Sequence, residues 1–132
     1  TFHLFRGQDF HYEAAYLAQE QFSIAGAAAV CFMAASLRKL MTQSGPDVYR
    51  LAHLEAGAAV QRAMLAAAAM GLAVMPIGSF FDREAREFFG LGTTPWHILY
   101  GFAVGVADPL GRHPRHVAGP KSLEPPPAPT AP

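Results

Sequence analysis

Residues 54–82 read LEAGAAVQRAMLAAAAMGLAVMPIGSFFD, and this stretch decides the fold. Its first part is rich in Ala, Leu and Met, which are among the residues with the best helix propensity. No charged residue separates Arg62 from Asp82, so we expect a helix that ends at Gly71 and is buried on most sides. A short apolar run and a tight turn follow over residues 73–79, which predicts that the helix leads into a strand.

The same stretch has a second interpretation as a membrane span, because its uncharged length is about right for a bilayer. The helical part, however, is mostly Ala, which gains little in lipid, and Pro76 and Gly78 interrupt it early. We therefore favour a central core helix over a transmembrane helix.

Length and composition point to one apolar domain. The chain has 132 residues, of which 52% are hydrophobic and 15% are charged, and this length is enough to bury a core. Such an apolar composition predicts that part of the surface is buried against a partner. The net charge is zero, which gives no indication of binding to nucleic acid or to an anionic membrane.

The single cysteine, Cys31, lies inside the apolar run of residues 27–35. A lone thiol in such a run is typical of a small core residue rather than of a nucleophile. One cysteine cannot form a disulfide within the chain, which is consistent with a reducing, cytoplasmic location.

Upstream of the long helix, we expect a helix, a strand and a surface connection. Asp9 is placed to cap a helix that runs to about Phe22. Residues 23–36 form a continuous apolar run that predicts a buried strand, although its Ala content also allows a helix. Residues 37–46 end in Ser-Gly-Pro and predict a surface connection, after which Asp47 favours the start of the long helix.

Downstream of the turn, residues 81–89 predict a short amphipathic helix closed by Gly90. Residues 98–107 predict a second buried strand, in which Gly101 and Gly105 allow another backbone to approach closely. Both elements are expected to pack in the same domain as the long helix.

The composition changes abruptly after residue 107. Residues 108–132 are rich in Pro, Ala and Gly and contain few apolar side chains to bury. We therefore expect an ordered domain over residues 1–107 and an extended or disordered tail over residues 108–132.

Three motifs carry a resemblance to a known family: GLAVMPIGSFFD at 71–82, REAREFFGLG at 83–92 and WHILYGFAVG at 96–105. Together with a matching register between Gln19 and Gly57, they resemble the C-terminal half of the nitroreductase superfamily of FMN flavoenzymes. More narrowly, the pattern is similar to the SagB-type dehydrogenases, the azoline oxidases of peptide natural-product pathways. The resemblance covers about residues 5–107. It implies half of an α+β fold, in which a central mixed sheet is flanked by helices and the long helix lies at a dimer interface.

The turn formed by Pro76, Ile77, Gly78 and Ser79 is the strongest candidate for cofactor binding. A flavin ring needs backbone donors near N5 and a backbone that approaches closely, which glycine permits. From the residues alone, an ordinary connection between secondary-structure elements is the simpler interpretation. The resemblance favours flavin contact, since the equivalent turn in nitroreductases lies against the isoalloxazine and its amide contacts N5.

Three charged residues are further candidates for cofactor binding. Related enzymes place a polar residue near the flavin at the position of Glu55, although the helix dipole alone would also stabilise a solvated glutamate there. Arg112 and Arg115 follow the last strand, where nitroreductases hold the FMN phosphate with basic residues, and a guanidinium binds such oxygen atoms bidentately. The alternative is that both arginines are solvated charges of the tail.

No metal site is expected. The spacing of His113 and His116 suits a metal only on a helix, and Pro114 between them disfavours a helix. The resemblance thus implies FMN as the cofactor, without a metal ion.

Two departures separate this chain from the family pattern. Azoline-oxidising members carry a Lys-Tyr pair for acid–base chemistry where this chain has Thr42 and Gln43, and neither of these side chains titrates near neutral pH. The N-terminal motif that binds the ribityl and phosphate groups of FMN, and the second flavin-contacting loop, have no counterpart in this sequence.

The resemblance thus implies a subunit or fragment of an FMN-dependent oxidoreductase that transfers hydride through flavin N5. A separate polypeptide or a paralogous subunit would supply the missing N-terminal half, giving a homo- or heterodimer. The alternative is a non-catalytic, nitroreductase-like structural subunit of a larger complex.

Overall fold

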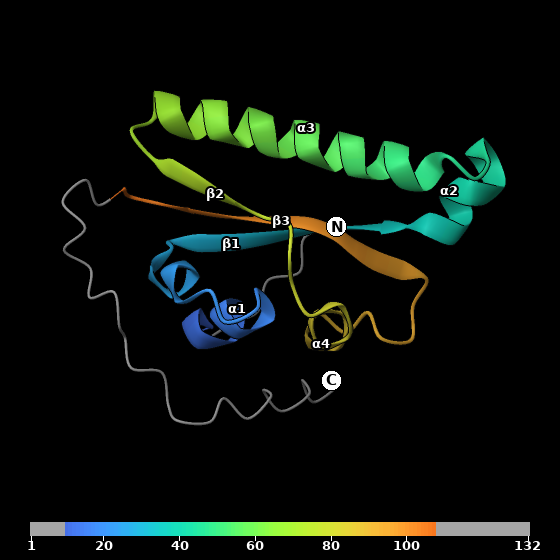
Figure 1. The fold of residues 1–132 in the computed structure, drawn as a ribbon, viewed down its shortest axis with the longest axis horizontal. Coiled ribbons are helices and arrows are strands. Elements are labelled where there is room, and N and C mark those ends of the chain that lie inside the picture. The colour runs from blue at the N-terminus through green and yellow to red at the C-terminus, as the bar shows by residue number, and fades with distance from the viewer. Residues whose placement is uncertain (1–9, 108–132) are drawn as a thin grey trace.

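The computed structural model describes residues 10–107, which form a three-layered α+β fold (Figure 1). In chain order the elements are α1 (His11–Leu17), the 3-10 helix η1 (Phe22–Gly26), β1 (Ala29–Ser36), α2 (Leu37–Ser44), α3 (Val48–Ala69), β2 (Ala73–Ile77), α4 (Asp82–Phe88) and β3 (Trp96–Gly105). The sheet forms the middle layer. The long helix α3 covers one face of it, and α1, η1 and α4 cover the other.

The strand that comes last in the sequence, β3, lies at the centre of the sheet, in the order β1-β3-β2. Both neighbours pair with it in antiparallel register, so Val30 of β1 and Met75 of β2 flank Ala103. An irregularity between Met33 and Ala34 shifts the register near the start of β3. The α+β fold is as expected. The resemblance also implied a mixed sheet, but β1 and β2, which run in the same direction, are separated by β3, so both described pairings are antiparallel.

The face of the sheet towards α1, η1 and α4 holds the larger side chains of the core. Leu17, Ile24 and Ile77 come from three different elements and are fully buried. Phe32 of β1 packs against the buried residues on this face, and its ring centroid lies 5.7 Å from that of Phe80. This face therefore holds the largest fully buried side chains of the described residues.

The opposite face is covered by α3 through small side chains. Ala52, Ala56, Val60 and Ala67 are the buried residues in the body of this helix. Ala52 and Ala56 pack against Leu99 of β3. Small residues let the helix lie close to the strands that it covers.

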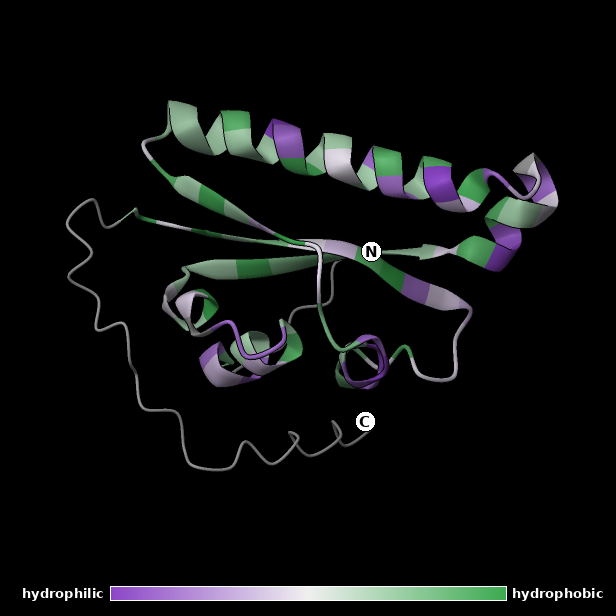
Figure 2. Ribbon diagram, viewed as in Figure 1, coloured by the Kyte–Doolittle hydropathy of each residue, from purple (hydrophilic) through white to green (hydrophobic). Residues whose placement is uncertain are grey.

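The large apolar side chains of α3 point away from the sheet. Leu51, Leu54 and Leu65 are each more than half exposed, as is Met70 just after the helix. Figure 2 shows apolar segments along the whole length of this helix. The expected burial on most sides is therefore met on the sheet side only, because residues 10–107 supply no further layer. Within residues 10–107, no helix combines the length and the hydropathy needed to cross a membrane.

The end of α3 confirms the role predicted for Gly71. This residue has a left-handed φ of 70°, and its amide donates to the carbonyl of Ala68 at 3.1 Å, while the amide of Leu72 donates to the carbonyl of Ala67 at 2.8 Å. These two bonds satisfy carbonyl groups that the helix leaves without partners, as in a Schellman motif. Gly90 also adopts a left-handed φ, of 66°, just after the end of α4.

The glycines of β3 also behave as expected. A Cβ atom at Gly101 would lie 3.0 Å from the carbonyl oxygen of Cys31 and 3.0 Å from the ring of Phe32. At Gly105 it would lie 3.3 Å from the backbone nitrogen of Ala28. The strand itself begins slightly earlier than predicted, at Trp96.

The N-terminal helix is shorter than expected. It ends at Leu17 rather than near Phe22, because Gln19 and Glu20 adopt left-handed φ angles of 56° and 60°, which a right-handed helix cannot continue. The apolar run that follows divides into η1 and β1 instead of forming one strand. Asp9, the expected cap, lies outside the described residues.

Residues 37–46 connect β1 to α3 at the surface, as predicted, but their helical conformation was not expected. Most of this segment forms α2, whose Leu, Arg, Lys and Met residues are strong helix formers. The Ser-Gly-Pro sequence only ends the helix, and Gly45 adopts a φ of 78° there. Asp47 precedes the first residue of α3, as expected, although its side chain makes no capping hydrogen bond.

Cys31 is exposed, so the expectation of a core residue was wrong. Side chains alternate between the two faces of a strand, and Val30 and Phe32 pack against the core on the α1 side. Cys31 therefore faces the α3 side, where α3 packs mainly on β3 and β2 and leaves Cys31 exposed. Neighbouring atoms still desolvate the sulfur enough to raise the pKa of the thiol.

Candidate functional site

The predicted turn lies beside a cavity of about 480 Å³. The start of α3, the coil that follows β2 and the start of β3 form its walls, and the loop after α1 adds one residue. Its polar and aromatic lining residues include Gln19, Tyr49, His53, Ser79, Phe80, Asp82, His97 and Tyr100. Most of these side chains carry a hydrogen-bonding group or an aromatic ring, which is the composition of a ligand site.

The structure brings only half of the predicted turn to this cavity. Gly78 and Ser79 line it, whereas Pro76 and Ile77 are the last residues of β2. Ile77 is 1% exposed and packs against the core on the other face of the sheet, and Pro76 is exposed. Pro76 and Ile77 are therefore not among the residues that line the cavity, because the strand extends further than the sequence indicated.

A close neighbour explains the glycine at position 78. A Cβ atom there would lie 3.2 Å from Cε2 of Tyr100, which is tighter than ordinary van der Waals contact. The aromatic ring therefore lies against the backbone of Gly78. A larger residue would push the tyrosine ring or the coil out of place.

Two contacts fix the coil of residues 78–81 to the end of α1. The hydroxyl of Ser79 donates a hydrogen bond to Oε1 of Gln19, and the amide of Phe81 donates to the carbonyl of Leu17 at 2.9 Å. The left-handed backbone at Gln19 places its side chain in this position. The coil is thus held from both ends before any ligand binds.

At the start of α3, Tyr49 and His53 lie one turn apart and contact each other. Their ring centroids are 4.4 Å apart, and Nδ1 of His53 lies 2.9 Å from the carbonyl oxygen of Tyr49. A carbonyl oxygen can only accept a hydrogen bond, so Nδ1 is the donor and carries a proton. In a neutral ring this leaves the lone pair on Nε2.

Arg86 of α4 organises the loop that leads to the third wall. Its guanidinium donates to the carbonyl of Thr94 at 2.9 Å, to that of Trp96 at 3.1 Å and to that of Leu91 at 3.2 Å. These bonds shape the chain immediately before His97, the first residue of β3 that lines the cavity. The conformation of the loop between α4 and β3 therefore depends on the side chain of Arg86.

The charge around the cavity is low. Asp82, the first residue of α4, is the one carboxyl group among the described lining residues, and no lysine or arginine is among them. No group of three metal-binding side chains occurs within residues 10–107. The described lining residues therefore offer few charged groups to a ligand.

Of the other residues predicted to bind the cofactor, Glu55 does not line this cavity. Glu55 is exposed and lies two positions after His53, which on an α-helix is more than half a turn around the axis. Arg112 and Arg115 lie outside the described residues, as do His113 and His116.

Sequence reasoning missed seven of the polar and aromatic lining residues, including Phe80 and Asp82 just after the predicted turn. Tyr49 and His53 could have been found, because a four-residue spacing places two side chains on one face of a helix. Gln19, His97 and Tyr100 come from other elements and meet the coil only through the tertiary fold. No local sequence pattern predicts that these three residues lie at the site.

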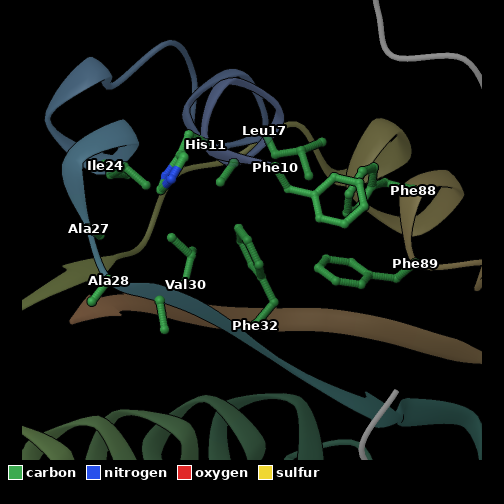
Figure 3. Close-up of a pocket in the computed structure, with 12 residues that line it drawn as sticks. Phe10, His11, Leu17, Ile24, Ala27, Ala28, Val30, Phe32, Phe88 and Phe89 are labelled. Carbon is green, nitrogen blue, oxygen red and sulfur yellow. The ribbon is translucent and has the colours of Figure 1, made fainter. Parts of the chain in front are cut away.

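A second cavity, of about 580 Å³, lies between α1, η1, α4 and β1 (Figure 3). Its walls are mainly aromatic and aliphatic, and the rings of Phe10 and Phe88 make an edge contact with centroids 5.4 Å apart. His11 brings the polar side chain seen in the figure. Because few polar groups converge there, we treat this cavity as part of the apolar core rather than as the functional site.

Comparison with known proteins matches this geometry to one family. The model of the nitroreductase family matches residues 4–106. A protein of Methanocaldococcus jannaschii, provisionally named a nitroreductase, is 31% identical over 88 residues, which are 67% of this chain and 44% of the relative. The crystal structure of a provisionally assigned nitroreductase from Anabaena variabilis, at 1.80 Å resolution, superposes with a TM-score of 0.73 and 34% identity. That match covers 79% of this chain and 21% of the other. The chain therefore spans less than half the length of these relatives.

Proposed function

The chain belongs to the nitroreductase family, and from this membership and the cavity beside Gly78 we propose that it forms one wall of the flavin site in an FMN-dependent oxidoreductase. When bound, FMN would exchange hydride with a substrate at N5. One observation carries the proposal: the coil of Gly78 and Ser79, which the family places at the flavin, lines a cavity with aromatic and polar walls.

The described residues suit the ring system of FMN better than its phosphate. Tyr49 and Tyr100 offer flat aromatic surfaces, and Gly78 lets the backbone come close to a ring. No described lysine or arginine lines the cavity. We propose that the phosphate is held by Arg112 and Arg115, or by the polypeptide that completes the fold.

The likeness to SagB-type dehydrogenases supports the FMN chemistry but not the usual azoline oxidation. Thr42 is exposed on α2 and its hydroxyl donates to the carbonyl of Arg38 at 2.9 Å. Neither Thr42 nor Gln43 lines the cavity. An acid–base group for this enzyme must therefore come from elsewhere.

The outer face of α3 favours a subunit interface. Leu54 and Leu65 are 66% and 64% exposed in this chain, and they lie on the helix that family members bury between subunits. We propose that a second copy or a paralogous subunit covers this face and supplies the missing half of the fold. The single chain would then not persist as a stable monomer.

The test is the flavin content of the purified protein together with the polypeptide that completes it. We expect absorbance near about 450 nm from bound FMN and its loss in Gly78→Val, because the branched side chain would meet the ring of Tyr100. Gly26→Val is the matched control, since a Cβ atom at Gly26 meets nothing within 4 Å. Full flavin content in Gly78→Val would show that the coil is only structural. A colourless wild-type complex would instead favour the non-catalytic structural subunit.

A further inference from the structure

We propose that His53 is the acid–base residue of this site and that it gives up a proton from Nε2 when hydride is transferred to the substrate. The inference rests on the proposed function, and it fills the role left empty by Thr42 and Gln43. Neither the family pattern nor the predicted turn pointed to this residue.

The hydrogen bond at Nδ1 fixes which nitrogen can exchange a proton. Nδ1 of His53 lies 2.9 Å from the carbonyl oxygen of Tyr49, and this acceptor keeps a proton on Nδ1 in both charge states of the ring. Only Nε2 is then free to gain or lose one. The ring of Tyr49, at a centroid distance of 4.4 Å, limits how the imidazole can turn.

Several titratable groups lie around His53, and it is the best suited of them. The first residue of α4 and the start of β3 contribute Asp82, His97 and Tyr100 to the same cavity. His53 and His97 contribute the two imidazoles among the described lining residues, and an imidazole nitrogen can donate or accept a proton. Among the described residues, no hydrogen bond fixes the ring of His97, which is exposed.

The remaining charges nearby lie outside the cavity. On α3 itself, Arg50 is exposed and does not line the site. The neighbouring helix α2 contributes Leu37 to the wall, while its Arg38 and Lys39 are exposed. A cation on His53 would therefore face Asp82 as the one carboxyl group among the described lining residues.

Reduction of the substrate needs one proton for each hydride, and we assign this proton to His53. Reduction of a polar double bond, such as N=O or C=O, adds hydride to one atom and leaves an electron pair on the other. The Nε2–H bond of the His53 imidazolium breaks, its proton goes to that second atom, and its electron pair stays on Nε2. The product is the neutral ring with its proton on Nδ1, which is the form that the carbonyl of Tyr49 stabilises. FMN, when bound and reduced, would supply the hydride, and solvent returns the proton because His53 is only partly buried.

The first test compares His53→Gln with His11→Gln, the same change on the far side of the sheet, in FMN-loaded protein. FMN is photoreduced without oxygen and mixed with nitrobenzene, which takes up one hydride and one proton to give nitrosobenzene and water. We expect His53→Gln to keep its FMN and to reoxidise about 100-fold more slowly, as for loss of a general acid. The wild-type rate should fall as the pH is raised and Nε2 loses its proton, and the variant should lack this fall. His11→Gln should match the wild type.

The outcomes separate this inference from the proposed function. If His53→Gln binds FMN and keeps the wild-type rate and pH profile, the role of His53 is wrong and the flavin site stands. If the wild-type protein binds no FMN, the proposed function and the role of His53 are both wrong. Nitrogen NMR of the labelled full chain gives a readout without activity: the neutral ring of His53 should carry its proton on Nδ1. A proton on Nε2 would overturn the inference.

Discussion

The two faces of the sheet are built on different principles. On the side of α1, η1 and α4, the largest fully buried side chains are Leu17, Ile24 and Ile77, and they come from different parts of the chain. On the side of α3, the buried helix residues are mostly alanines, while Leu54 and Leu65 point outwards. The first face carries a core of large buried side chains. The second face is covered by α3 alone, whose outer leucines are exposed.

This difference shows where the chain is self-sufficient. Burial of large side chains from several elements stabilises the fold of one chain, because the apolar area removed from water is large. A helix with small residues on its inner side and leucines on its outer side gains most of its burial from a partner. The candidate site lies where these two regions meet, between the start of α3 and the coil that is fixed to α1.

The largest effect should come from the core on the side of α1, η1 and α4. Ile77→Ala should lower the free energy of unfolding by about 3 kcal/mol, because it leaves a cavity among fully buried neighbours. Val74→Ala, on the same strand but on the α3 face, is the matched control and should cost less than about half of that. Urea unfolding of the full-length protein measures both. Because Val→Ala removes fewer carbon atoms than Ile→Ala, equal losses would mean that the α3 face is packed at least as tightly as the other.

Sequence reasoning recovered the elements whose signals are local. The end of α3 followed from Gly71, which adopts a left-handed φ of 70°, and the close approach at Gly101 followed from its lack of a side chain. Cys31 was misplaced for a different reason. Its apolar neighbours indicated a core strand, but burial there depends on how far α3 extends over β1, which no local pattern encodes.

The candidate site was predictable only in part for the same reason. Gly78 and Ser79 could be identified from their motif, because the function of that coil depends on backbone close to a ligand. Gln19 and Tyr100 reach the cavity through a loop after α1 and through strand pairing. Contacts between residues so far apart in the sequence arise from the fold as a whole.

A smaller effect should appear at the outer face of α3. Leu65→Ala should weaken association with the partner subunit about tenfold, since one exposed leucine that becomes buried contributes on the order of 1.5 kcal/mol. Glu87→Gln, an exposed change on α4, should leave association unchanged. Sedimentation equilibrium over a range of concentrations measures the dissociation constants. Identical constants for Leu65→Ala and the wild type would show that the partner does not cover this face.

The smallest effect concerns Cys31, which lies on the α3 side of β1 beyond the cover of that helix. Desolvation raises the pKa of its thiol although the residue is exposed, so the folded state disfavours the thiolate. The contribution of this group to stability is therefore present below the pKa of the unfolded thiol and is lost as the pH rises through the folded pKa.

Because the thiolate is the reactive form, iodoacetamide at mildly alkaline pH should alkylate Cys31 more slowly in the folded protein than in urea, and raising the pH should narrow the gap. The chain has a single cysteine, so mass spectrometry follows the reaction without ambiguity. Equal rates in the folded and unfolded states would show that the uncovered part of the sheet behaves as open solvent. A slow rate that does not respond to pH would point instead to steric cover by the partner subunit.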